Sequence, residues 1–125
     1  MAPFTYELLP LGAVKPNGWM KDQLELQASG LSGHLFDFYR YVKNSLWLGG
    51  TLEYNELHEA GPYWYNGIVP LAYVLDDQRL KDQANYFLEY VLDHQADDGW
   101  LGPETAREER GIWARCLLLQ GIMVY

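Results

Sequence analysis

One stretch with helical spacing of its apolar side chains constrains the fold of this 125-residue chain most strongly. In residues 79–94, apolar side chains recur every three or four positions, at Leu80, Ala84, Phe87, Leu88, Val91 and Leu92. This period is typical of an amphipathic helix that buries one face. Asp76 and Asp77 precede the stretch and can cap its first turn. We therefore predict a helix over residues 79–94.

Four further stretches show helical spacing between glycine and proline residues, and we predict helices over residues 19–29, 34–44, 63–76 and 108–125. Asn17 is placed to cap the first of these helices, and Pro62 suits the first turn of the third. Pro70 falls inside the third pattern and lacks an N–H, which predicts either a late start near Val69 or a kink beside Gly67.

The connections between these stretches predict an all-α fold of antiparallel helical hairpins. Proline and glycine keep residues 1–16 as an extended lead-in. The short turn at Gly30 predicts that the first two helices run antiparallel. Residues 44–51 have the pattern of a loop, and residues 51–59 fit either a loop or a short helix. Strand patterns are nearly absent, so we predict one helical domain, residues 1–125, with a core that includes Leu80, Phe87, Leu88, Val91, Leu117 and Leu118.

The negative charge of the chain limits the classes of partner that it can bind. The formal net charge is -8 and the sequence pI is about 4.7, which argue against nucleic acid and against anionic membrane surfaces. No apolar run reaches the roughly 18 to 20 residues that cross a bilayer. The amino end has neither the basic nor the apolar region of a signal peptide. We expect a soluble protein without a signal peptide. The sequence does not indicate its cellular compartment.

Cysteine and histidine usage argues against a metal or another cofactor in this chain. Cys116 is the single cysteine, so an internal disulfide is excluded, and its apolar setting predicts a small core side chain. Zinc takes about four ligands in tetrahedral geometry, whereas His34, His58, His94 and Cys116 have unrelated spacings. We therefore predict no metal site.

Clusters of aromatic, acidic and glycine residues point to carbohydrate. Five tryptophans and ten tyrosines are many for core filling alone. A flat ring can stack on a sugar face while carboxylates and amides beside it bind hydroxyl groups. Such clusters stand at the edges of the predicted helices, and the candidate sugar contacts are Trp64, Asn66, Trp100 and Glu104. The alternative for any one of these rings is packing at the corners between helices.

Several of these motifs together resemble the amino-terminal part of the family 127 glycoside hydrolases, the β-L-arabinofuranosidase-like proteins. The resemblance is carried by residues 10–24 (PLGAVKPNGWMKDQL), 30–35 (GLSGHL), 47–50 (WLGG), 63–75 (YWYNGIVPLAYVL) and 94–103 (HQADDGWLGP). It implies an (α/α)6 toroid of six helical hairpins. This chain would supply the first two and a half hairpins of that larger catalytic toroid.

The resemblance also implies where the chemistry lies. The family's glutamate acid/base and its zinc-bound cysteine nucleophile stand downstream of the matched region. Cys116 does not match the nucleophile motif, so that role is not carried onto it. We expect the isolated chain to be inactive, and zinc to belong only to a full-length relative.

Two functions therefore stay open: a glycoside hydrolase-family protein that acts on cell-wall or plant-type sugars, and a non-catalytic helical module that binds carbohydrate or assembles with itself. Residues 112–125 are apolar on nearly every side, which predicts a homo-oligomer through contacts such as Trp113, Leu117 and Met123. Arg115 is the charged residue in this stretch, and an acid or a carbonyl must satisfy it, with an ion pair as the first expectation.

Overall fold

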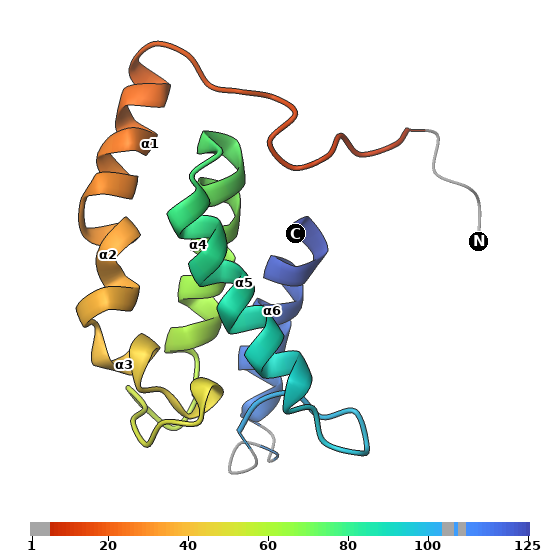
Figure 1. Cartoon of the computed structure of the whole chain (residues 1–125). Helices are drawn as coiled ribbons and strands as arrows, with labels where there is room; N and C mark the ends of the chain where they lie inside the picture. The colour runs from red at the N-terminus through yellow and green to blue at the C-terminus, as the bar shows by residue number, and fades with distance from the viewer. Residues whose placement is uncertain (1–5, 104–106, 108–109) are drawn as a thin grey trace.

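The computed structural model of the chain describes residues 6–103, 107 and 110–125, and the fold is all-α. Its helices are α1 (Trp19–Ser29), α2 (Leu31–Phe38), α3 (Arg40–Lys43), α4 (Ala60–Leu75), α5 (Gln78–Asp93) and α6 (Gly111–Val124), with a 3-10 turn, η1, at Leu46–Leu48. The described residues form no strand, only an isolated bridge between Ser45 and Leu52. In Figure 1, α1 and α2 descend along one side, α4 ascends, α5 descends and α6 ascends.

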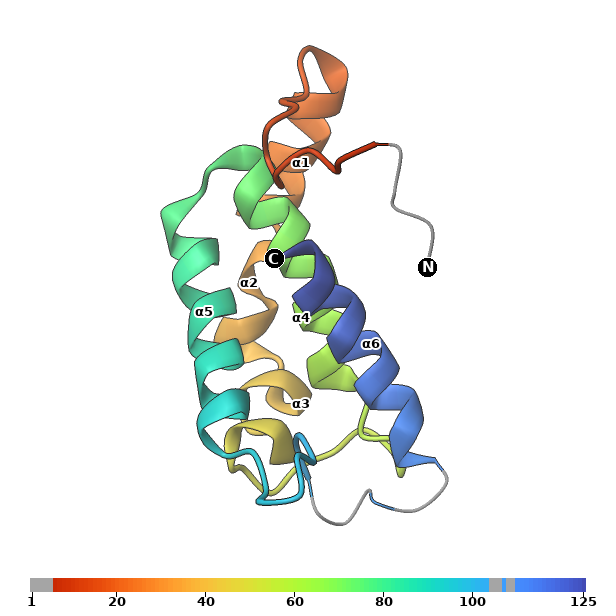
Figure 2. The ribbon, with the colours of Figure 1, turned by 90° about the vertical axis from the view of Figure 1, so that its right-hand side faces the viewer.

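Helix α4 is the centre of the bundle because it packs against all the other α-helices. It packs most extensively against α5 and α6. Tyr65 of α4 is fully buried and stacks on Phe87 of α5, with ring centroids 5.3 Å apart. Helices α4 and α6 lie side by side and run in the same direction, with α5 on the other side of α4 (Figures 1 and 2). The amino-terminal ends of α4 and α6 therefore lie at the same end of the bundle, which we call the lower end.

The strongest sequence pattern is confirmed except at Leu92, which is 49% exposed and lies beside the buried face rather than on it. Helix α5 covers Gln78–Asp93, and Asp77 caps it by accepting a hydrogen bond from the backbone N–H of Leu80 at 3.1 Å. The predicted core residues are all buried, namely Leu80, Phe87, Leu88, Val91, Leu117 and Leu118. The helix predicted over residues 19–29 has those bounds, and α6 agrees with residues 108–125 over the part that the structure describes.

Helix α4 corrects the expectation about Pro70. The helix begins at Ala60 and continues through Pro70 to Leu75, so a late start near Val69 is wrong. Val69 and Leu71, on either side of the proline, are both buried. Their packing compensates for the one backbone hydrogen bond that a proline removes from a helix interior.

The predicted first hairpin is also wrong. Helix α2 begins at Leu31 rather than residue 34, and Figure 1 shows it following α1 in nearly the same direction. One non-helical residue, Gly30, separates the two helices, and one residue can bend a chain but not reverse it. A Cβ at Gly33 would lie 1.8 Å from the Ala28 carbonyl oxygen, so the start of α2 sits tightly against the end of α1.

The predicted 34–44 helix is interrupted at Tyr39, whose ψ of 105° is extended. The break separates α2 from the short α3 and allows Val42 to be buried against the core, with Tyr39 packed beside it. Residues 51–59 form turns and not a short helix. Asn17 does not cap α1, because its side chain accepts from the neighbouring Gly18 N–H and Gly18 itself takes the cap position.

The described part of the lead-in, residues 6–16, is not helical and crosses the upper end of the bundle (Figure 1). Lys15 Nζ donates to the carbonyls of Tyr73 and Val74 at 2.9 and 3.0 Å. A cation there complements the carboxyl end of α4, where helix carbonyls are unpaired. Among the described helices, none has the length and apolar character that a membrane span requires.

Helix α6 is buried along one face only. Ala114, Leu117, Leu118 and Gly121 pack inward, whereas Ile112, Leu119 and Met123 are exposed. Cys116 is exposed too, so its predicted core position is wrong. The helical period sets this outcome, because Cys116 lies four residues after Ile112 and shares its outward face.

The close approach of α4 and α6 depends on Gly121. A Cβ there would lie 2.6 Å from Tyr65 Cδ1, and Tyr65 has no free space because it is buried against Phe87. We expect Gly121→Ala to lower the free energy of unfolding by about 1–3 kcal/mol, since an inserted methyl group forces the helices apart. Urea unfolding of the two proteins measures the difference.

Gly67→Ala is the matched control, because Gly67 lies inside α4 and a Cβ there would meet nothing within 4 Å. An alanine in an open helical position should raise stability by about 0.5–1 kcal/mol. Equal effects of the two substitutions would contradict the packing described for α4 and α6.

Candidate functional site

A hollow lined by aromatic rings lies between α2, α3 and the first turns of α4. We call it the aromatic groove. Its volume is about 360 Å³, within the range of small-molecule sites, and its lining residues are Leu35, Tyr39, Val42, Tyr54, Glu59, Ala60, Tyr63 and Trp64. Tyr54 and Tyr63 are 63% and 49% exposed, so their rings are available for contact with a ligand.

A second hollow of about 190 Å³ continues the aromatic groove along α4. The two hollows share Leu35, Tyr63 and Trp64. Gln27 and Ser32 add polar groups to the wall of the second hollow. The two hollows therefore form one extended groove, with Trp64 at its base, because Trp64 is only 6% exposed and packs against Phe36 and Phe87.

Glu59 places a carboxylate at the edge of the aromatic groove. Its Oε2 accepts a hydrogen bond from Trp113 Nε1 of α6 at 2.7 Å, and its Oε1 accepts from Asn55 Nδ2 at 3.2 Å. Both donors are neutral, and each carboxylate oxygen can accept a second hydrogen bond. Glu59 is thus held in a fixed orientation with capacity left for hydroxyl or N–H donors of a ligand.

A buried arginine organises the loops beside the groove. The Arg115 guanidinium lies over the rings of Trp47 and Trp100, 4.8 and 4.0 Å from their centroids. It donates to the carbonyls of Leu101, Pro103 and Gly111 at 2.8, 3.1 and 2.9 Å. Backbone carbonyls are therefore partners of Arg115, as the sequence allowed, and the expected ion pair stays a prediction. This arrangement compensates for the cost of burying a cation.

Glu53 and His58 form a buried pair within the loop of residues 44–59. Their side chains are only 8% and 12% exposed, and Glu53 Oε1 lies 3.9 Å from His58 Nδ1. Oε1 accepts from the Leu46 N–H at 3.1 Å, whereas Glu53 Oε2 and His58 Nδ1 have no hydrogen-bond partner among the described residues. Burial raises the pKa of Glu53 to about 7, and it lowers the pKa of His58, which the positive charge of Arg115 lowers further.

The three candidate sugar contacts that the structure describes, Trp64, Asn66 and Trp100, do not line one hollow. Trp64 lines the aromatic groove, but Asn66 donates its side-chain N–H to Gln120 of α6 at 3.3 Å. Trp100 stacks on Arg115 and donates from Nε1 to the Pro103 carbonyl, so its ring packs a loop. Glu104 lies outside the described residues.

Sequence reasoning did not select Tyr39, Tyr54, Glu59 and Tyr63 as site residues. The tyrosine count and the Tyr63-Trp64-Tyr65 cluster were the available signals. They could not show which rings share a hollow, because three separate segments build it. The described residues bring together no group of three or more metal-ligating side chains. No family model, curated protein or solved structure matches the chain.

Proposed function

We propose that this chain is a carbohydrate-binding helical domain, the amino-terminal part of a glycoside hydrolase-family protein similar to family 127. The observation that carries the proposal is the aromatic groove, in which exposed tyrosine rings stand beside an oriented carboxylate. Sugar rings present C–H faces that stack on aromatic rings, and their hydroxyl groups donate to carboxylates. A furanose or pyranose unit has both properties, and the joined second hollow gives room for a second unit.

The direction of the helices supports the toroid part of the proposal. In an (α/α)6 toroid, the inner helices run parallel to one another and each outer helix runs the opposite way. Helices α4 and α6 are parallel neighbours, while α1, α2 and α5 run oppositely (Figure 2). In the proposed toroid, α4 and α6 would be inner helices, and α1, α2 and α5 would be their outer partners. The catalytic glutamate and zinc-bound cysteine are assigned to a region downstream of the matched residues, so the proposed role of residues 1–125 is binding without hydrolysis.

Binding can be measured on the chain itself. We expect L-arabinose and a short arabinofuranosyl oligosaccharide to shift amide resonances of residues 54–64 in NMR titrations, without release of free sugar. Tyr63→Ala removes an exposed ring and Glu59→Gln removes the charge of the carboxylate acceptor. Each should weaken binding roughly tenfold, the loss that corresponds to about 1.4 kcal/mol of contact energy.

Tyr86→Ala is the control, because Tyr86 is a comparably exposed ring on α5 that does not line the groove. It should leave affinity unchanged. Shifts that spread evenly over the chain, or equal losses in all three variants, would refute a sugar site in the aromatic groove. Release of arabinose by the chain would show that catalytic residues lie within residues 1–125 and not downstream of them.

A second candidate function is self-assembly through α6, which we propose as contact with a second copy of this chain. The observation in its favour is the exposed apolar face of α6, on which Trp113 and Met123 lie; Met123 is 83% exposed. Leu117 cannot contribute, since it is buried within the chain. The same face on two copies can pair about a two-fold axis and remove apolar surface from water.

Light scattering tests the assembly. We expect a mass above 14.5 kDa that increases with concentration, and a return to the monomer mass in the double variant Leu119→Lys, Met123→Lys. The charges should disrupt an apolar contact between copies. Leu92→Lys, at an exposed leucine on α5, is the control and should not change the mass. A wild-type chain that stays a monomer at high concentration would rule out the assembly.

A further inference from the structure

The loop of residues 44–59 is closed by contacts between its two ends. The Leu52 N–H donates to the Asn44 carbonyl at 3.0 Å, and Trp47 Nε1 donates to the His58 carbonyl at 2.6 Å. The Leu46 N–H donates to Glu53 Oε1 at 3.1 Å. His58 adopts a φ of 52°, which a non-glycine residue takes only when its surroundings hold it there.

This loop also builds one wall of the aromatic groove. Tyr54 lies next to Glu53 in the chain and lines the groove, and Glu59 lies next to His58 and does the same. The groove residues are therefore attached to the two members of the buried pair. A shift of Glu53 or His58 would therefore also shift Tyr54 or Glu59 in the wall of the groove.

The Glu53–His58 pair accommodates a proton better than a negative charge. Glu53 Oε2 is buried without a hydrogen-bond partner among the described residues, and burial outweighs the backbone N–H groups of Leu46 and Tyr54, which favour the carboxylate; a protonated carboxyl is neutral and can donate. His58 Nδ1, which is also buried without a described partner, lies 3.9 Å from Glu53 Oε1 and can accept a proton after a small adjustment.

We propose that the Glu53–His58 pair is a proton-controlled latch of the 44–59 loop, closed when the pair holds one proton and released when that proton is lost. Release moves Tyr54 and Glu59, and with them the wall of the aromatic groove. The latch itself stands on the geometry of the loop, whereas its effect on a sugar rests on the proposed function.

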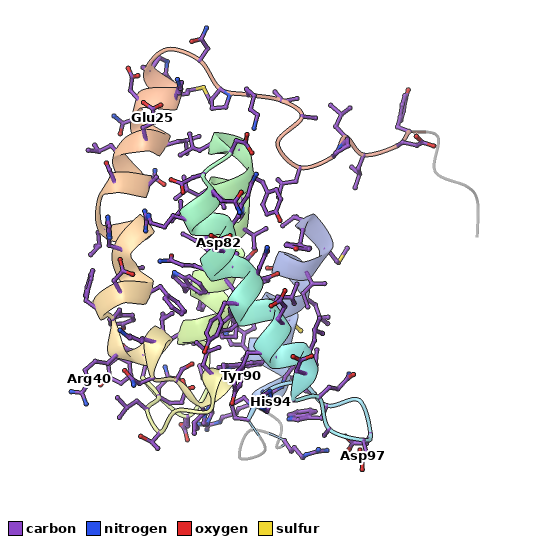
Figure 3. All side chains as sticks on the ribbon, viewed as in Figure 1. Glu25, Arg40, Asp82, Tyr90, His94 and Asp97 are labelled. Atoms are coloured by element: carbon purple, nitrogen blue, oxygen red, sulfur yellow. The ribbon has the colours of Figure 1, made fainter. Side chains whose placement is uncertain are left out.

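Among residues 6–103, 107 and 110–125, charged and titratable groups approach the pair from α6, from α5 and from within the loop. From α6, the positive charge of Arg115 reaches His58 and disfavours a second proton there. From α5, the Tyr90 hydroxyl lies against Gly49 of the loop, and His94 stacks on the Tyr90 ring at 4.0 Å; Figure 3 shows both residues at the lower end of α5. Within the loop, Glu56 pairs outward with Arg110, and Glu59 is held by Trp113 and Asn55.

The direction of the pH response follows from the two pKa shifts. The pKa of Glu53 is raised from 4.5 to about 7, so its stabilising contribution is complete below 4.5 and is lost as the pH rises through about 7. The pKa of His58 is lowered from 6.5, so its contribution is present above 6.5 and is lost as the pH falls. Just below pH 6.5 the two contributions offset each other, and above 6.5 only the loss from Glu53 remains, so the loop should open more readily as the pH rises from 6.5 through about 7.

The test uses residues 1–125 without any ligand. Carboxyl ¹³C resonances report the titration midpoint of Glu53, and amide exchange, corrected for intrinsic rates, reports protection at Leu46 and Leu52 between pH 6 and 8. We expect a Glu53 midpoint near 7 and about threefold lower protection at pH 8 than at pH 6, because the loss of one proton is offset by His58 up to pH 6.5 and acts alone from there to about 7. A titration midpoint of the Glu53 carboxyl near 4.5 would overturn the latch, regardless of the results with the variants.

Glu53→Gln mimics the protonated carboxyl and leaves only the His58 contribution, so its protection should not fall between pH 6 and pH 8. Glu56→Gln is the control, since Glu56 is exposed, and it should respond as the wild type does. A wild-type pH response that persists in Glu53→Gln would overturn the proposal.

A loop that responds to pH in a chain that binds no sugar would refute the proposed function alone. Sugar binding with unchanged protection from pH 6 to 8 would refute the latch alone.

Discussion

Burial of the Arg115 guanidinium is the constraint on which the lower end of the molecule depends. A cation taken out of water must be surrounded by acceptors and by ring faces, and Arg115 finds them in three segments that are distant in sequence. It contacts the ring of Trp47 in the 44–59 loop, the ring of Trp100 and carbonyls in the loop that follows α5, and the first turn of its own helix. Because the fork of a guanidinium is planar and rigid, these contacts fix the two loops relative to α6.

The central position of α4 determines which segments of the chain Arg115 can contact. Gly61 at the start of α4 lies against the rings of Phe87 and Trp47, and Gly121 of α6 lies against Tyr65 of α4. The Gly121 contact brings α6 close to α4, and the Gly61 contact brings the start of α4 against the 44–59 loop and α5. The aromatic groove, the Glu53–His58 pair and the Glu59–Trp113 contact all lie at that end. One structural requirement, the burial of Arg115, thus connects the proposed binding site with the proposed latch.

Patterns in the sequence predicted the parts of the fold that depend on interactions between residues near in sequence. Helix α5 carries its own amphipathic period and its Asp77 cap, and both are visible without any knowledge of the rest of the chain. The direction of α2 could not be predicted in this way, since it depends on the tight contact between Gly33 and the Ala28 carbonyl. The continuity of α4 through Pro70 depends on packing from both neighbours. The sequence showed that Arg115 needs a partner, but not that loop carbonyls supply it.

The residues of the candidate site also fall into two groups, those that the sequence could indicate and those that depend on contacts distant in sequence. Trp64 was recognisable as a ring in an aromatic cluster, and it does line the groove. Asn66, two residues further along the same helix, points to Gln120 because two residues turn a helix by about 200°. Glu59 could not be singled out among 17 acidic residues, since its role comes from a contact with Trp113 that spans 54 positions.

Amide exchange in the Arg115→Lys variant shows whether Arg115 holds the two loops together. Lysine keeps the charge but cannot stack between two rings while it donates to three carbonyls. We expect the Leu52 amide in one loop and the Ala96 amide in the other to lose protection together by about tenfold or more; these amides donate to the carbonyls of Asn44 and Trp100. Amides at the centre of α5 should keep their protection, and Arg110→Lys, at the exposed partner of Glu56, should change neither loop. Loss of protection in only one loop, or in neither, would contradict the claim that Arg115 holds the two loops as a unit.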